Sequence, residues 1–215
     1  YISDMMVDTF EEGAVISSCD DIASIQVDME HSYLGDLDIF IECPNGTQVL
    51  LQAQAGGGTF LGEPVDVEGD FSAGTCYAYG WTEDSTLGLM HEGNVTIMSY
   101  TDTQGNAATG NILDEGFYAP YESLCALEGC PLNGTWQFGY TDLLGLDNGS
   151  ACSWGIEFNA ALLPDLPNGA PSIGLNADSS YWSSWSAALD VLELSEDGNR
   201  LDLQTTTSGM FNASG

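Results

Sequence analysis

One segment, HSYLGDLDIFIECPNG at residues 31–46, gathers side chains that are able to do chemistry. They are His31, Asp36, Asp38, Glu42 and Cys43. An imidazole beside carboxylates can serve acid–base catalysis or metal binding, so both kinds of site have to be considered. The acids alternate with Leu and Ile, however, and strict alternation is typical of a strand with one buried face. The segment therefore also fits a strand that ends in a Pro-Asn-Gly turn and has no chemistry of its own.

The motifs of nucleophilic catalysis are missing. The chain has no Gly-x-Ser-x-Gly elbow,. Its two histidines are His31, in the strand pattern, and His91, in the loop LMHEGN. Acids are so abundant that a carboxylate pair for glycoside hydrolysis can be drawn from many places and carries little weight. We therefore predict that the protein is not an enzyme.

A calcium site is the alternative for these acids. Calcium takes about 6–8 oxygen ligands, so carboxylates from several loops would have to converge. The candidate ligands are Asp36, Glu63, Asp66, Asp142 and Asp147. No EF-hand spacing is present, so this prediction rests on the excess of acid and not on a motif.

The charge balance excludes several classes of partner. There are 33 Asp plus Glu against a single Arg and no Lys, which gives a net charge of -32. Such a chain repels phosphates and anionic lipid, so we expect neither nucleic acid binding nor membrane insertion. Hydrophobic residues make up 43% of the chain and are interleaved with the acids. This composition indicates a folded protein with an acidic surface rather than a disordered one.

Long, Gly-rich loops separate some of the strands and contain a group of aromatic residues. Its members are Tyr77, Tyr79, Trp81, Tyr118 and Tyr121. We expect these rings to pack the loops together. Stacking on sugars is the alternative, which leaves carbohydrate as a candidate partner.

Six cysteines indicate an oxidising environment. They are Cys19, Cys43, Cys76, Cys125, Cys130 and Cys152. Their wide spacing and the shortage of His argue against zinc and for disulfides, and hence for a secreted or cell-surface location. Six cysteines allow 15 pairings, and the spacing does not choose among them. Cys125 and Cys130 are close enough in sequence to close the loop CALEGC.

Short alternating stretches between turn signals recur along the chain. They are residues 22–31, 36–43, 47–52, 94–100, 135–142 and 152–158. In the last two, Trp136, Phe138 and Tyr140, and then Cys152, Trp154, Ile156 and Phe158, fall on single faces,. Asn-Gly dipeptides supply turns, and no segment has a convincing helical stripe,. The pattern predicts an all-β, jelly-roll-like sandwich followed by a short, partial β region.

We expect four parts along the chain. Residues 1–10 would form an N-terminal arm or strand with no place in its own sandwich. Residues 11–160 would form the sandwich, and 161–175, which contain three prolines, a linker. Residues 176–215 offer at most three strands, too few for a closed domain.

Three blocks resemble the P domain, or Homo B domain, of proprotein convertases. The first two are MEHSYLGDLDIFIECPNGTQVLL and LNGTWQFGYTDLLGLDNGSACSWGIEF. The third, GGGTFLGEPVDVEG with APYESLCALEGCPLNG, is similar to the form found in large secreted proteins of Bacteroidetes-type bacteria. The resemblance covers roughly residues 10–160. It implies a jelly-roll module without chemistry of its own that stabilises a neighbouring protease or serves as a repeated surface module.

The resemblance also bears on the first segment. It implies that His31 and Asp36 belong to the strand-turn-strand framework. From the residue types we expect His31 to hydrogen-bond across the sheet and Asp36 to cap a turn. Ser85, in the triplet Asp-Ser-Thr, is similar to the O-glycosylation motif of such bacteria.

The ends of the chain predict how copies meet. An apolar arm and an apolar C-terminal strand would pair head to tail and build a surface filament or adhesin. The predicted contact residues are Ile2, Met5, Val7, Phe10, Met210 and Phe211. The partners would then be copies of the chain itself. The alternative function is that of an accessory or carbohydrate-binding module excised from a secreted protease or hydrolase.

Overall fold

A computed structural model describes residues 1–65, 72–102, 104, 106–144 and 148–162, and the backbone alone of 189–194 and 201–205. The chain divides into two compact units, Tyr1–Gly174 and Leu175–Gly215. Two of the predicted calcium ligands, Asp66 and Asp147, and two of the predicted contact residues, Met210 and Phe211, lie outside the described residues.

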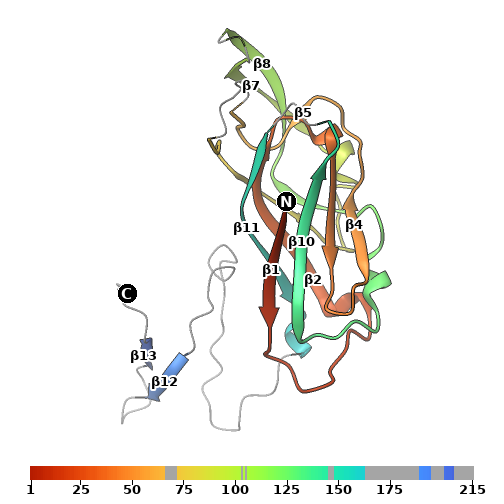
Figure 1. Cartoon of the computed structure of the whole chain (residues 1–215), viewed down its shortest axis with the longest axis vertical. Helices are drawn as coiled ribbons and strands as arrows, with labels where there is room; N and C mark the ends of the chain where they lie inside the picture. The colour runs from red at the N-terminus through yellow and green to blue at the C-terminus, as the bar shows by residue number, and fades with distance from the viewer. Residues whose placement is uncertain are drawn as a thin grey trace. The chain divides into compact units, whose positions relative to one another are not determined.

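The described residues of the first unit form three sheets (Figure 1). One has the order β1 (Ile2–Val7), β10 (Gly134–Asp142), β3 (Leu37–Glu42) and β4 (Gln48–Gln52). A second has the order β11 (Gly149–Phe158), β2 (Ile22–His31), β6 (Tyr77–Trp81) and β9 (Gly116–Tyr118). A third has the order β5 (Thr59–Phe60), β8 (Ala107–Leu113) and β7 (Val95–Thr101). The short 3-10 helices are η1 (Cys19–Asp21), η2 (Leu34–Asp36), η3 (Met90–Glu92), η4 (Leu124–Leu127) and η5 (Ala160–Leu162). The predicted all-β sandwich is confirmed.

Alternating side chains fill the core of the first unit. On β3 the residues Leu37, Ile39 and Ile41 are fully buried, as the alternation predicts,. Burial of apolar surface stabilises the fold by about 25 cal/mol per Å², so this face holds β3 in register.

Aromatic rings join the two four-stranded sheets. On β10 the predicted face of Trp136, Phe138 and Tyr140 is buried. Phe138 stacks on Trp154 of β11, with 5.6 Å between ring centroids. The prediction for β11 holds only in part, because a bulge between Ala151 and Ser153 breaks its alternation,. Trp154 is buried, whereas Cys152 is exposed.

The N-terminal segment is an edge strand of its own sandwich, which corrects the expectation of a free arm. β1 pairs with β10 in antiparallel register along its whole length. Met5 and Val7 pack against the core. Phe10 is buried and meets the ring of Phe158 edge to face at 5.1 Å. These three predicted polymer contacts are therefore structural residues of one copy, and of the four predicted contacts in the arm only Ile2 is well exposed.

The second unit contains one described hairpin. β12 (Leu189–Leu194) pairs antiparallel with β13 (Leu201–Thr205). The predicted linker lies outside the described residues except for its first two positions.

Candidate functional site

The last residue of β2, His31, is buried at a junction of three strands. Its backbone pairs with Gly149 of β11 on one side. On the other side it exchanges two hydrogen bonds with Leu61, both at 2.9 Å. Only glycine fits at position 149, because a Cβ there would overlap the His31 ring and the Glu30 carbonyl. The small partner thus makes room for a fully buried imidazole.

The His31 ring has one defined partner on each nitrogen. Nδ1 accepts a hydrogen bond from the backbone N–H of Tyr33 at 3.2 Å. The proton of a neutral ring is therefore on Nε2, which lies 3.9 Å from Oδ2 of Asp142,. The predicted hydrogen bond across the sheet is thus wrong for this side chain, since its hydrogen bond is local.

Asp36 and Asp142 approach His31 from two different elements. Asp36 ends η2, and its carbonyl accepts from the N–H of Leu143 at 2.8 Å, which ties η2 to the end of β10. Burial lowers the pKa of His31, and the charges of Asp142 and then Asp36 oppose that effect. The ring is accordingly neutral at pH 7, so its contacts with the two carboxylates are not ion pairs.

Tyr140 covers the other side of the imidazole. The two rings meet edge to face, with 6.2 Å between centroids. Burial raises the pKa of Tyr140 to about 12, so its hydroxyl stays protonated and donates to the Gly149 carbonyl at 3.0 Å. This bond fixes β10 to β11 beside the histidine.

In the described part of the chain, no nucleophile is hydrogen-bonded to this histidine. Ser32 is fully buried, and its Oγ has no hydrogen-bond partner among the described residues. Both ring nitrogens of His31 are directed at other groups, so the Ser–His contact of a hydrolase is not formed. Burial raises the pKa of Glu30 on the other flank, while the hydroxyl and backbone of Ser150 and the backbone of Gly74 lower it in part. The arrangement resembles a buried polar framework more than an active site.

The predicted calcium ligands divide into separate places. Asp36 and Asp142 are near each other through His31. Glu63 instead accepts a hydrogen bond from the hydroxyl of Tyr77 at 2.9 Å. Among the described residues, the only group of three His, Cys, Asp or Glu with ligand atoms close together is Cys19, Cys125 and Glu128. Two of its members form a disulfide, so that group is not a metal site, and calcium binding stays a prediction.

All six cysteines form disulfides, as predicted. The pairs are Cys19–Cys125, Cys43–Cys130 and Cys76–Cys152. A link between Cys125 and Cys130 is therefore wrong. Their sequence separations of 106, 87 and 76 residues make every bond a long-range one. The loops overlap, so residues 19–152 form one covalently linked region.

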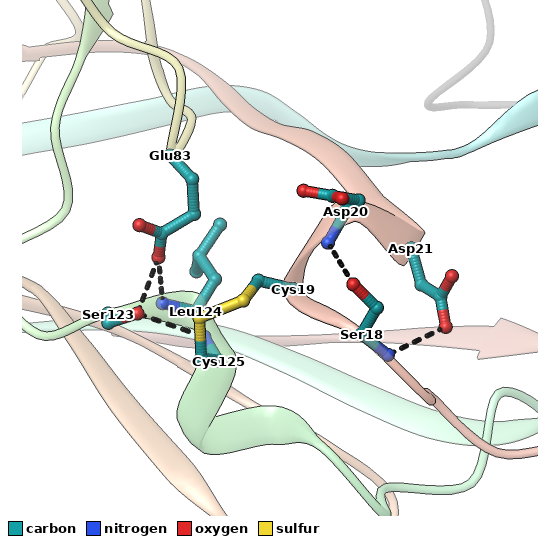
Figure 2. Close-up of a disulfide and its surroundings, with 8 residues drawn as sticks. All are labelled: Ser18, Cys19, Asp20, Asp21, Glu83, Ser123, Leu124 and Cys125. Carbon is teal, nitrogen blue, oxygen red and sulfur yellow. Dashed lines mark hydrogen bonds between the residues drawn. A yellow bond between two sulfur atoms is a disulfide. The ribbon is translucent and has the colours of Figure 1, made fainter.

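The Cys19–Cys125 bond joins two capped 3-10 helices (Figure 2). At η1, Ser18 and Asp21 form a reciprocal capping box,. At η4, Glu83 accepts hydrogen bonds from the hydroxyl of Ser123 and the N–H of Leu124. These capping contacts were not predicted from the sequence, although Ser-x-x-Asp at 18–21 is a recognisable capping signal. Glu83 carries no such signal because it reaches η4 from 40 residues away.

The remaining sequence predictions concern surface chemistry. Of the aromatic group, Tyr79, Trp81 and Tyr118 are buried, which closes these three rings to sugars. They lie on β6 and β9 and belong to the core of the sandwich, which corrects the expectation that they lie in long loops and pack those loops together. Ser85 is half-buried, and its hydroxyl donates to the Phe117 carbonyl at 2.8 Å. A glycan on Ser85 would remove that hydrogen bond, and glycosylation stays a prediction.

The described part of the chain is thus a disulfide-bonded β-sandwich with a buried histidine. The family model of the proprotein convertase P-domain matches residues 21–112. This match runs from the start of β2 into β8, while β10 and β11, which complete the core, lie beyond it. No curated protein and no solved structure matches the chain.

The P-domain is a non-catalytic accessory module of proprotein convertases, which are secreted proteases. Three disulfides agree with an extracellular fold,. Within the described part of the chain, no helix is long and apolar enough to cross a bilayer.

Proposed function

We propose that the protein is a non-catalytic, extracellular structural module of the P-domain type. The observation that carries the proposal is the P-domain match on a sandwich whose buried histidine contacts no nucleophile. A buried, neutral imidazole between a backbone N–H and a carboxylate stabilises the junction of β2, β10 and β11 without needing substrate. His31 then has the role of a framework residue.

The finer form of this proposal is a subunit or repeat of a surface filament or adhesin in a Bacteroidetes-type bacterium. The net charge of -32 would keep the lateral faces of neighbouring fibres apart,. β1 occupies its own sandwich, so a contact between copies has to use another surface than the predicted arm. The P-domain match favours a second candidate, an accessory module that stabilises a neighbouring domain of a secreted protease.

A panel of protease, esterase and glycosidase substrates, with a fluorophosphonate probe for reactive serines, tests the absence of catalysis in the intact chain. We expect no turnover and no labelling, and the same result for His31→Gln. Turnover that disappears in His31→Gln would overturn the proposal. A glycan array tests the carbohydrate alternative, and specific binding there would favour the accessory role over the filament.

A further inference from the structure

The three-stranded sheet of β5, β8 and β7 contains no charged residue. This is unusual in a chain with 33 Asp plus Glu, and both four-stranded sheets do carry acids within their strands. The nearest acids along the sequence lie at the ends of the hairpin. Asp102, at its tip, accepts from the N–H of Asn106 at 2.8 Å, and Asp114 accepts from the hydroxyl of Thr96 at 2.7 Å.

The two faces of this sheet differ. On the inner face, Phe60 of β5 meets the ring of Tyr100 edge to face, with 4.9 Å between centroids. Gly110 of β8 lies under Phe60, since a Cβ there would approach its ring to 2.8 Å. On the other face, Val95 and Ile97 of β7 are 42% and 73% exposed. β7 therefore has an uncharged outward face with two exposed apolar side chains.

The edge of β7 is also open. Among the described residues, β7 is hydrogen-bonded to β8 on one side and to no strand on the other. β7 and β8 lie together at one end of the first unit, beyond the ends of β10 and β2 (Figure 1). Proteins usually block such edges with charges, Pro or bulges, and the sequence VTIMSYT has none of these,. A seven-residue uncharged edge is a template for pairing with another strand,.

We propose that this edge joins two copies of the chain, with β7 of one copy antiparallel to β7 of the other. The charge selects this occupant. Two copies that each carry -32 repel across most of their surfaces, and the Debye length of about 8 Å at 0.15 M salt does not screen direct contact,. They can approach closely where acids are missing, and β7 itself is the matching uncharged strand, with an edge that no other described strand covers. The pairing is two-fold, so each strand contributes the same groups and the two sheets become one.

This inference rests on the proposed structural function and names the surface through which copies meet. A two-fold contact closes on itself, so it yields a dimer, and growth into a filament requires a second interface. Because the contact is uncharged, raising the salt reduces the remaining repulsion and strengthens the dimer.

Sedimentation velocity of the intact 215-residue chain over a range of concentrations, in 0.15 M and 1 M NaCl, tests the proposal. We expect a monomer–dimer equilibrium that shifts toward dimer in 1 M NaCl. Ile97→Asp should weaken the dimer by at least tenfold, and Ser99→Asp, on the same face of the strand, should do the same. The matched control is Met6→Asp, because Met6 is 68% exposed on the other terminal edge strand, β1. It adds the same charge and should leave the dimer unchanged.

Several outcomes overturn the proposal. They are a monomer at every concentration and salt, a dimer that dissociates in 1 M NaCl, and dissociation by Met6→Asp but not by Ile97→Asp. Circular dichroism checks that each variant is folded, and Ser99→Asp decides the matter if Ile97→Asp unfolds. A monomer without hydrolase activity would remove this contact and leave the proposed function standing. A dimer that turns over a substrate would support this contact and remove the proposed non-catalytic function.

Discussion

Removal of the Cys19–Cys125 disulfide should destabilise the fold by less than the sequence separation of the two cysteines implies. Its 106-residue separation alone corresponds to a loss of about 4.8 kcal/mol from the entropy of loop closure,. The Cys43–Cys130 bond provides a shortcut, however, because 24 residues separate Cys19 from Cys43 and 5 separate Cys130 from Cys125. The loop that the first bond closes is then about 30 residues, worth about 3.6 kcal/mol.

The double variant Cys19→Ala/Cys125→Ala tests this reasoning by urea unfolding under oxidising conditions, with the free energy of unfolding compared with that of the intact chain. We expect a loss of about 3.6 kcal/mol with an accompanying rise in the m-value, because the unfolded chain becomes less compact. The matched control removes Cys76–Cys152. Its shortest remaining path, 33 residues from Cys76 to Cys43 and 22 from Cys130 to Cys152, gives a larger loss of about 4.2 kcal/mol,. A loss below about 1.5 kcal/mol, or one near 4.8 kcal/mol with Cys43–Cys130 intact, would refute the shared-loop argument.

Three further predictions concern the buried histidine and the acids. Since the pKa of His31 is lower in the folded chain than in the unfolded one, the unfolded chain takes up the proton first as the pH falls,. The difference in free energy of unfolding between the wild type and His31→Gln should therefore be constant above pH 7 and fall below about pH 6.5. Urea titrations at several pH values measure this difference, and a value that does not change with pH would contradict the burial of a neutral ring. Gly149→Ala should cost about 1–3 kcal/mol because its Cβ overlaps the His31 ring, whereas Gly58→Ala, whose Cβ would make only ordinary contacts with Tyr33, should change little; equal thermal shifts would contradict this,. If calcium binds, a concentration of about 100 times its Kd adds about 2.7 kcal/mol to the free energy of unfolding. EDTA should then lower the melting temperature, and NaCl should not restore it. An unchanged melting temperature in EDTA would remove the calcium prediction.

Part of the strand pattern was predictable because it depends on neighbours in sequence, whereas β5, β6, β8 and β9 were not predicted. β2 spans the predicted residues 22–31, and β3, β4, β7 and β10 each begin and end within one residue of the prediction. The alternation of apolar and polar side chains reports directly which face is buried. It fails at β11, where the bulge at residues 151–153 shifts the face, and a bulge leaves no signal in hydropathy,.

Contacts between residues that are far apart in the chain could not be predicted from the sequence. The partner of β1 is β10, and the paired residues are 127 to 137 positions apart, so an apolar N-terminal strand could not be told from an arm. The same holds for Asp142, which reaches His31 across 111 positions. Six cysteines with 15 pairings leave the connectivity open for the same reason. In each case the missing information is tertiary, and a single sequence contains no direct measure of it.

The overlapping disulfides also set how far the module can stretch under tension. A pulling force applied between residues 19 and 152 of the unfolded polypeptide would run along the shortest covalent route, which crosses the Cys19–Cys125 bond and then follows 27 residues to Cys152. At about 3.4 Å per residue this route extends to about 90 Å, against about 450 Å for the 133 residues of an unlinked chain,. Even fully unfolded, this region therefore reaches only about one fifth of the length of an unlinked chain, so the disulfides cap its extension,.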